Sequence, residues 1–470
     1  MRRFYIAALI ILSLSFHASA QEAGGETVLE LKGFLINAVK HGSFKEILMD
    51  ELSLKYNRIL GTPQLQLLLD STAQYKLSLD PGGKSSLSGD ISLSSLFPSS
   101  GTTVSAEYDT ERSSSLGLQT SAIALKVEQS VLKNAFGSSN RLKEMMAGNE
   151  ETLARYQILE SYEDYLAQVI DIYLEWDTAY RNMKYAQKYL EDSRTLLSLT
   201  KRKQQYGIAL PLDVNKSTLQ VLNSEEQLNQ ATNDYETARK KVVLLSGIAE
   251  KDFTYVPGGI VPSINDEELE KQNSKFLSES RTVKMLDLLL RIGKQQLNLA
   301  LDDLLPTATV YASYNLGGAD YLPLESATSD IKLGFSLSVP LLNTQAQAKA
   351  EIQKNTLDKT IVSQLNQKEQ LELQLHTLMQ TIVFLRKQLA LAEQKLKTAQ
   401  LIVQQERRQY NQGRAGLDDL INAYQTLDTI SQARLATMGQ LTKNYIEWLR
   451  FTDSLIDDNH QITDHGISQD

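Results

Sequence analysis

Cysteine is absent from this 470-residue sequence, and histidine occurs only five times. Without cysteine the chain has no disulfide framework, and no acylated cysteine can anchor its N-terminus to lipid. The histidines show no metal-ligand spacing, and neither a Gly-rich phosphate loop nor a nucleophile elbow occurs. We therefore predict that the chain is not an enzyme and that it holds no metal or other cofactor.

Positive charge and long apolar runs are also scarce. The 48 Lys and Arg residues are outnumbered by 57 Asp and Glu, and they form no basic stripe of the kind that nucleic-acid phosphates require. We therefore expect no nucleic-acid partner. Beyond the first 20 residues, no apolar run approaches the roughly 18 to 20 residues that a membrane-spanning helix needs. If the chain crosses a membrane, it must do so with strands.

The two ends of the chain differ from the rest. Met1-Arg2-Arg3, an apolar run from Ile6 to Leu14 and the small residues Ala18-Ser19-Ala20 predict a secretory signal peptide over 1–20, with a buried N-terminal helix as the alternative. Residues 454–470 form a polar tail that we expect to be disordered. Cation binding by its Asp and His residues is the alternative.

Between these ends the sequence describes the same arrangement twice. Each copy has a segment that alternates with period two, a long heptad-patterned helix, a turn with Gly and Asp, and a shorter returning helix. This duplication predicts a first repeat over 21–250 and a second over 266–453. The stretch 251–265 between them is rich in helix breakers, and we interpret it as an equatorial linker.

Alternation of apolar and polar residues predicts the strands. It is clearest from Gln64 to Asp80 and recurs over 308–314 and 331–339. The segment 85–120 is rich in Ser, Thr and Gly between turn signals, which suggests an extra hairpin and leaves the strand count open. A barrel with lipid outside and water inside gives this pattern, and so does a half-buried soluble sheet.

Heptads predict the helices. Apolar residues recur at steps of four and three over about 140–206 and again over about 345–410, which is typical of coiled-coil packing. Helices of about 66 residues are roughly 100 Å long. The returning helices cover about half of that length, so we expect shorter helices over 27–60 and 266–304 to cover the remainder.

In this order, the segments resemble the TolC family of outer-membrane efflux and export channels. The residues that carry the resemblance are the turn motifs of the two repeats and the short motif at the end of the last predicted strand. They are Tyr410-Asn411-Gln412-Gly413 followed by Asp419-Leu420-Ile421-Asn422-Ala423, Gly207 with Asp213-Val214, and Val339-Pro340-Leu341-Leu342.

The resemblance implies a mostly α fold with a membrane β-barrel portion. In such a fold three copies each contribute four strands to one 12-stranded barrel, which is continued by a periplasmic α-helical tunnel. It also implies an outer-membrane channel of a tripartite efflux or type I secretion system, with a large periplasmic part. The implied partners are outer-membrane lipid, a periplasmic adaptor (membrane fusion) protein at the helix tips, and an inner-membrane transporter of RND or ABC type.

The resemblance further assigns roles to the turns that end the long helices. It implies a pore gate in the form of an acidic ring, a latch between hairpins, and glycines and a proline in the tip turns. These residues are Asp418 and Asp419 for the ring, Asp213, Tyr410 and Arg414 for the latch, and Gly207, Pro211, Gly413 and Gly416 for the turns. Asp at a helix start is also an ordinary cap.

Two positions depart from the family pattern, because Asn422 stands where some members carry a second gate aspartate and Arg414 is placed differently.

The competing hypothesis is a secreted or periplasmic coiled-coil scaffold without a pore. Such a scaffold has no need for duplicated strand pairs ahead of each long helix, whereas a channel does. The sequence does not specify the cargo.

Overall fold

The structure is a computed structural model of the full chain. It describes residues 22–23, 26–40, 42–79, 85–113, 119–262, 264, 266–320, 328–456 and 467–468. The predicted signal peptide and most of the predicted polar tail lie outside these residues.

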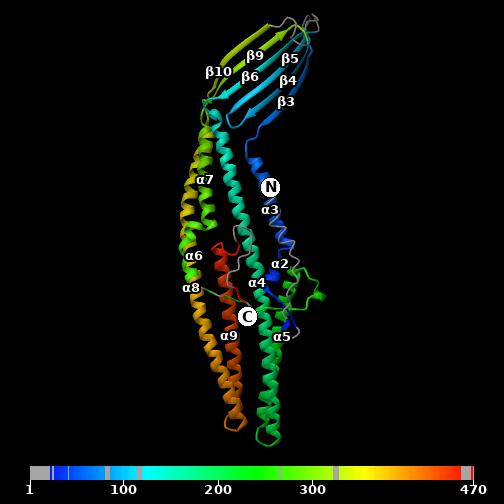
Figure 1. Ribbon diagram of the computed structural model, residues 1–470, viewed down its shortest axis with the longest axis vertical. Coiled ribbons are helices and arrows are strands. Elements are labelled where there is room, and N and C mark those ends of the chain that lie inside the picture. Colours follow the sequence, from blue (N-terminus) through cyan, green and yellow to red (C-terminus); the bar gives the residue numbers. More distant parts are fainter. Residues whose placement is uncertain are drawn as a thin grey trace. The chain divides into compact units, whose positions relative to one another are not determined.

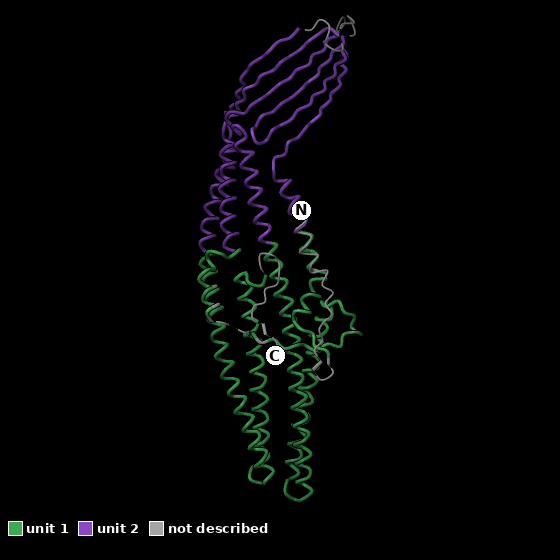
Figure 2. The backbone as a smooth tube through the Cα atoms, viewed as in Figure 1, with its two compact units in different colours: residues 1–50, 158–281, 368–470 green, residues 51–157, 282–367 purple. Residues whose placement is uncertain are grey.

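The chain divides into two compact units (Figure 2). Unit 1 comprises residues 1–50, 158–281 and 368–470, and unit 2 comprises residues 51–157 and 282–367. Each unit draws segments from both predicted repeats, and the two are described separately below. The predicted repeat boundaries stay a prediction.

Unit 2 contains an antiparallel sheet of six strands. The strands are β3 (Gln66–Lys76), β4 (Ser86–Phe97), β5 (Thr102–Ser113), β6 (Gln119–Ser130), β9 (Thr307–Gly318) and β10 (Thr328–Ser338). Their order across the sheet is β10-β9-β6-β5-β4-β3, and every neighbouring pair is antiparallel (Figure 1). The strands of the first and second repeats therefore meet where β6 pairs with β9.

The strand count corrects what the resemblance implied. Four strands per chain are too few, because the Ser-, Thr- and Gly-rich segment alternates as the other strands do and forms the added hairpin β4–β5. Its turn closes where Gly101 takes a φ of 67°, a left-handed conformation that favours glycine, and donates its N–H to the Phe97 carbonyl at 2.9 Å. The extra hairpin that the sequence suggested is thus present.

The long helices agree with the heptad pattern to within two residues at each end. They are α4 (Ser138–Gln205) and α8 (Thr344–Asn411), each of 68 residues, and both contribute to both units. Within unit 1 the returning helices α5 (Pro211–Ser246) and α9 (Leu417–Phe451) run alongside α4 and α8, respectively (Figure 1). In the described part of the chain, no helix is both long enough and apolar enough to cross a membrane.

The predicted shorter helices are both interrupted. The first is divided into the strand β2 (Glu26–Leu29) and the helices α2 (Leu31–Ala38) and α3 (Gly42–Gly61). The second breaks at Ser280 into α6 (Asp266–Glu279) and α7 (Arg281–Asp302). Both interruptions satisfy tertiary contacts that helical periodicity alone cannot reveal.

The first of these contacts lies in the aromatic core of unit 1. There β2 pairs in parallel with β7 (Tyr255–Pro257), which belongs to the predicted linker. The Tyr173 hydroxyl of α4 donates to the Leu29 carbonyl of β2 at 2.6 Å and accepts the N–H of Gly258, the residue after β7, at 2.9 Å. Phe34 and Trp176 pack against the same ring and are completely buried.

The remaining short elements of unit 1 are η2 (Glu250–Asp252), β8 (Val261–Pro262), β11 (Ile467–Ser468) and β1 (Glu22–Ala23). The remaining short element of unit 2 is η1 (Ala135–Gly137).

Candidate functional site

The sheet of unit 2 gathers nearly all of its charged side chains on one face. Residues directly opposite each other in an antiparallel ladder point to the same face, so the register assigns every side chain to one of two faces. All charged strand residues except Arg112 fall on one face, here called the polar face. They are Asp70, Lys76, Asp90, Glu107, Asp109, Glu111, Lys126, Glu128, Asp330 and Lys332.

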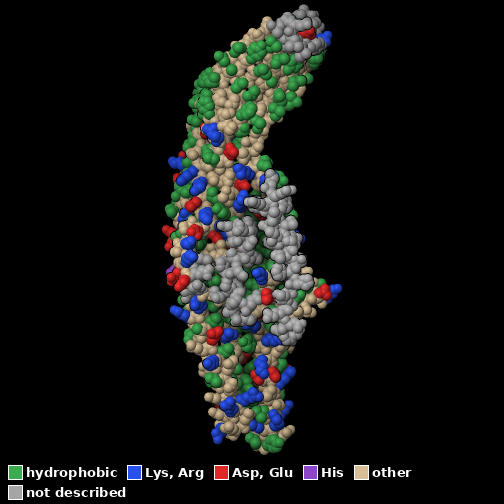
Figure 3. Space-filling view, viewed as in Figure 1, with side chains coloured by type: hydrophobic (Ala, Val, Ile, Leu, Met, Phe, Trp, Pro, Cys, Tyr) green, Lys and Arg blue, Asp and Glu red, His purple; other side chains and the backbone are tan. Residues whose placement is uncertain are grey.

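The other face, here called the apolar face, carries hydrophobic side chains on all six strands and Arg112 as its one charged strand residue. One row across it comprises Leu69, Leu93, Ala106, Leu125, Tyr314 and Ile331. Hydrophobic side chains gather over this sheet, with very few charged ones, in the space-filling view (Figure 3). Leu67, Ile331 and Leu333 are 72%, 73% and 80% exposed, so this face is open to its surroundings. A sheet of this kind can separate an apolar phase from water.

An aromatic ring covers a glycine on the polar face. Tyr311 of β9 lies directly opposite Gly334 of β10, and a Cβ atom added at Gly334 would overlap the Tyr311 ring. The Lys126 ammonium lies 5.1 Å from the centre of that ring. The glycine is therefore required by the ring's position.

The two helical tips of unit 1 are built alike. Gly207 and Gly413 end α4 and α8 with φ values of 73° and 70°, which glycine adopts without strain. Pro211 begins α5, where its missing N–H costs nothing, and Gly416 immediately precedes α9. The tip-turn residues expected from the sequence thus occupy the turns.

Two of the three predicted aspartates of the turns cap their helices. Asp213 Oδ2 accepts the Leu210 N–H at 2.9 Å, and Asp419 Oδ2 accepts the Gly416 N–H at 3.1 Å. In each case the carboxylate reaches back three residues and lies near the positive end of the helix dipole. The capping alternative is therefore present for both, and it leaves their other carboxylate oxygens open to further contacts.

Tyr410 joins the two tips within one chain. Its side chain is 5% exposed, and its hydroxyl is 3.2 Å from Oγ1 of the fully buried Thr200. The Lys203 ammonium lies 3.6 Å from the ring centre and also donates to the Tyr410 carbonyl. Burial lowers the pKa of Lys203 and raises the pKa of Tyr410. Sequence reasoning missed Thr200 and Lys203, because their partner lies about 200 residues away.

Asp418 and Arg414 differ in their contacts. The Asp418 carboxylate forms an ion pair with Lys216 of α5, at 2.7 Å from Nζ to Oδ2, while 64% of its side chain remains exposed. Among the described residues, the Arg414 side chain has no hydrogen bond or ion pair, and no hydrogen bond joins it to Asp213 or Tyr410. Within one chain the predicted latch residues are therefore not brought together by hydrogen bonds.

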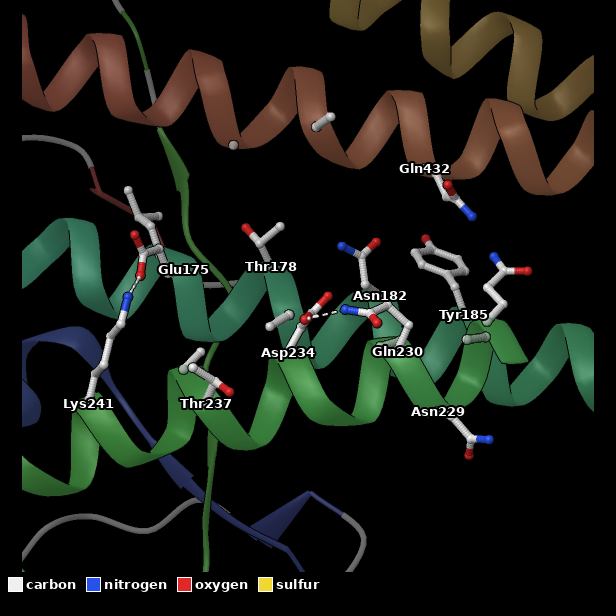
Figure 4. A pocket seen from close by; sticks show the side chains of 18 of the residues that line it. Glu175, Thr178, Asn182, Tyr185, Asn229, Gln230, Asp234, Thr237, Lys241 and Gln432 are labelled. Carbon is white, nitrogen blue, oxygen red and sulfur yellow. Dashed lines mark hydrogen bonds and ion pairs between the residues drawn. The ribbon is translucent and has the colours of Figure 1, made fainter. Parts of the chain in front are cut away.

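A groove of about 1390 Å³ lies between α4, α5 and α9 in unit 1, and most of its lining residues are polar or charged. Asn182 and Tyr185 of α4 point towards Gln432 of α9 across it (Figure 4). Along its walls Lys241 pairs with Glu175 at 2.7 Å, and Lys443 pairs with Asp171 at 2.7 Å. Amides and paired charges suit a water-filled passage and offer no activated nucleophile.

A buried charge cluster surrounds Arg281 at the start of α7. Its guanidinium lies 3.1 Å from Glu160, 2.7 Å from Glu163 and 3.4 Å from Asp453. Burial raises the pKa of Glu163 to about 7, and burial together with the neighbouring Asp453 raises that of Glu160 to about 7. Sequence reasoning did not identify this cluster, since its members come from α4, α7 and the segment that follows α9.

Known proteins share this architecture. Residues 88–247 match the sequence model of a family described as outer membrane efflux protein. Solved structures of outer-membrane channels match 90% or more of this chain. The resemblance to the TolC family is thereby confirmed. The matched family is one of transport proteins, not of enzymes.

Three solved relatives illustrate the TolC-like fold. VceC, an outer membrane protein from Vibrio cholerae, has 13% identity and a TM-score of 0.67, covering 90% of this chain and 95% of its own. The MtrE outer membrane channel of Neisseria gonorrhoeae has 14% identity and a TM-score of 0.63, covering 90% and 88%. CusC, which forms a transmembrane channel, has 12% identity and a TM-score of 0.66, covering 93% and 95%. Identities this low show the fold alone. No curated protein sequence matches the chain significantly.

The TolC-like family match and these relatives agree with the predicted localisation, since they are outer-membrane channels whose helices form a large periplasmic part. They do not favour the scaffold hypothesis.

Proposed function

We propose that three copies of this chain form the outer-membrane channel of a tripartite efflux or type I secretion system. The channel passively conducts cargo from an inner-membrane pump of RND or ABC type, through a periplasmic adaptor, to the exterior. The observation that carries this proposal is the sheet, which places every charged strand residue except Arg112 on one face. Such a sheet fits lipid against its apolar face and water against its polar face.

The helical hairpins of unit 1 supply the periplasmic tunnel in this proposal. Their groove between α4, α5 and α9, with its many polar and charged residues, would give a hydrated lining. Cargo would therefore pass along amides, hydroxyls and paired charges interspersed with small aliphatic side chains.

A gate at the tips follows from the placement of the acidic residues. Asp418 is largely exposed and Asp419 is adjacent to it at the start of α9, so three copies would bring six carboxylates around a threefold axis. Asp213, Tyr410 and Arg414 would form the latch between hairpins, and within one chain Tyr410 already contacts Thr200 and Lys203 of the first hairpin. Opening then requires only that the paired hairpins change their packing when a partner binds.

The tip between α4 and α5 has an exposed apolar surface that suits docking of the adaptor. Its turn exposes four large apolar side chains, which a monomeric water-soluble surface does not usually cluster. They are Tyr206, Ile208, Leu210 and Leu212, with 80%, 68%, 65% and 57% of their surface exposed. An adaptor with an apolar tip of its own would cover them.

Single-channel recording in a planar lipid bilayer tests the proposal. The wild type is expected to give small cation-selective steps, and Asp418→Asn/Asp419→Asn is expected to lose this selectivity. Asp213→Asn is the matched control, because Asp213 makes the same capping bond on α5. As a latch residue it should raise conductance and keep selectivity. A protein that stays soluble without detergent and never inserts would instead favour the scaffold.

A further inference from the structure

The six-stranded sheet ends in two edges that have no partner among the described strands. β3 pairs only with β4, and β10 pairs only with β9. Both edge strands have 11 residues, and their side chains are almost all exposed. An edge in hydrocarbon leaves its N–H and C=O groups without hydrogen bonds, so an edge of this length has to be paired for the sheet to sit in lipid.

The strand directions make a second copy of this chain the natural partner. Five antiparallel pairings separate β3 from β10, so the two edges run in opposite directions. β10 of one copy can therefore pair antiparallel with β3 of the next, and rotation repeats the same contact around a ring. Closure within one chain is excluded, because about eight strands already leave room only for packed side chains.

We propose that β3 and β10 form the seam between copies and that three copies close a barrel of three times six, or eighteen, strands. The resemblance implied twelve. This inference rests on the trimer of the proposed function. The added hairpin β4–β5 is the source of the difference, since without it β3 and β6 would still be antiparallel and would leave four strands per chain. Barrel diameter grows about linearly with strand number, so the lumen would be about one and a half times wider than in the twelve-stranded case.

The tilt of the strands specifies a register for the seam. Six strands spaced about 4.8 Å apart, tilted by about 35°, advance the register by about six residues per copy. Leu69 of β3 and Ile331 of β10 lie in one row across the sheet. Ile331 should therefore face the residue six places beyond Leu69 in the next copy, which is Tyr75. If the register advanced in the opposite direction, Ile331 would face Pro63, which lies outside β3.

Charge and hydrophobicity agree with this register. It puts Lys76 of β3 opposite Asp330 of β10, so opposite charges meet across the seam on the polar face. It also puts Ala73 opposite Leu333, which continues the apolar face from copy to copy. Each exposed hydrophobic edge strand thereby becomes an interior strand of a continuous sheet.

Disulfide cross-linking tests both the seam and the number of copies, because the natural chain has no cysteine. Tyr75→Cys/Ile331→Cys and Ala73→Cys/Leu333→Cys each place two thiols opposite each other at the seam, within the reach of a disulfide. Oxidation of the assembled protein should give a covalent ladder on denaturing gels that ends at three chains. Each single variant should stop at two chains or fewer. Leu69→Cys/Ile331→Cys is the out-of-register control and should not form the ladder.

Other outcomes would overturn the inference in distinguishable ways. A ladder that ends at two chains would mean twelve strands, and a ladder only in the out-of-register control would mean a different seam. Absence of a ladder in both seam pairs, with bilayer conductance retained under reducing conditions, would reject the seam and leave the proposed channel function standing. Loss of conductance in the unmodified protein would count against the function itself.

Discussion

Asp90 of β4 lies directly opposite Asp109 of β5, so two carboxylates occupy one position of the ladder on the polar face. Like charges directly opposite each other weaken a strand pair. The pair belongs to the added hairpin, and Glu107 and Glu111 lie on the same face of β5. In a closed barrel the hairpin would therefore add both width and negative charge to the lumen.

Asp90→Asn/Asp109→Asn should lower the cation preference of the channel and stabilise the sheet by about 0.2 to 1 kcal/mol. The reversal potential across a salt gradient measures the first effect, and thermal unfolding in detergent measures the second. Glu111→Gln is the control. Because Glu111 faces Ser88, this substitution removes one charge without relieving a like-charge pair. Equal stabilisation by the control would contradict the assigned repulsion.

Lys216→Met should release Asp418 from its ion pair and raise the open probability of the channel. Both partners are substantially exposed, so we expect a change of about twofold, corresponding to roughly 0.5 kcal/mol. The effect should shrink at high salt, where an exposed pair is screened. Lys188→Met serves as the control, since the ion pairs of Lys188 within the described part of the chain are with Glu191 and Asp192 of its own helix. An unchanged open probability at low salt would remove this pair from the gate.

The cluster around Arg281 should make stability depend on pH. The folded-state pKa values of Glu160 and Glu163, about 7, lie above the ordinary value of 4.5, so the folded state holds more protons between these limits. Stability contributed by these groups is therefore present at low pH and is lost as pH rises towards 7. The charged groups facing Glu163 are Arg281, Asp453 and Glu160.

Glu163→Gln should reduce this dependence, because it removes one of the two titrating groups. The fall in the thermal unfolding midpoint from pH 5 to pH 8 is expected to be smaller in the variant than in the wild type. Glu226→Gln, at an exposed position of α5, should leave the dependence unchanged. A variant with the same pH dependence as the wild type would show that Glu163 does not titrate in this range.

Gly334→Val should destabilise the sheet, because its side chain would overlap the Tyr311 ring. We expect a cost of roughly 1 to 3 kcal/mol, as for other overpacked sites. Tyr311→Ser in the same chain should restore most of the lost stability by removing the ring. Heat resistance of the assembled protein on semi-native gels measures both. Failure of the second substitution to rescue the first would mean that backbone strain, not the ring, excludes a side chain at 334.

Repetitive local patterns were the predictable part of this protein. The heptads placed α4 and α8 to within two residues, since a seam of apolar side chains has the period of the helix that carries it. Alternation likewise placed β3, β9 and β10 and suggested the hairpin that became β4–β5. The turn glycines and capping aspartates were equally predictable from the sequence, because turns and caps depend on a few adjacent residues.

The sequence by itself therefore determined the long helices, the returning helices, the alternating strands and the tip turns. Only the tertiary structure decided the six-strand order, the division of the predicted helix 27–60 by the pairing of β2 with β7, and the contacts of Tyr410 with Lys203 and of Arg281 with Glu163. Each of these joins residues far apart in the chain. No local period encodes such a pair, because its partners meet only when whole elements pack against one another.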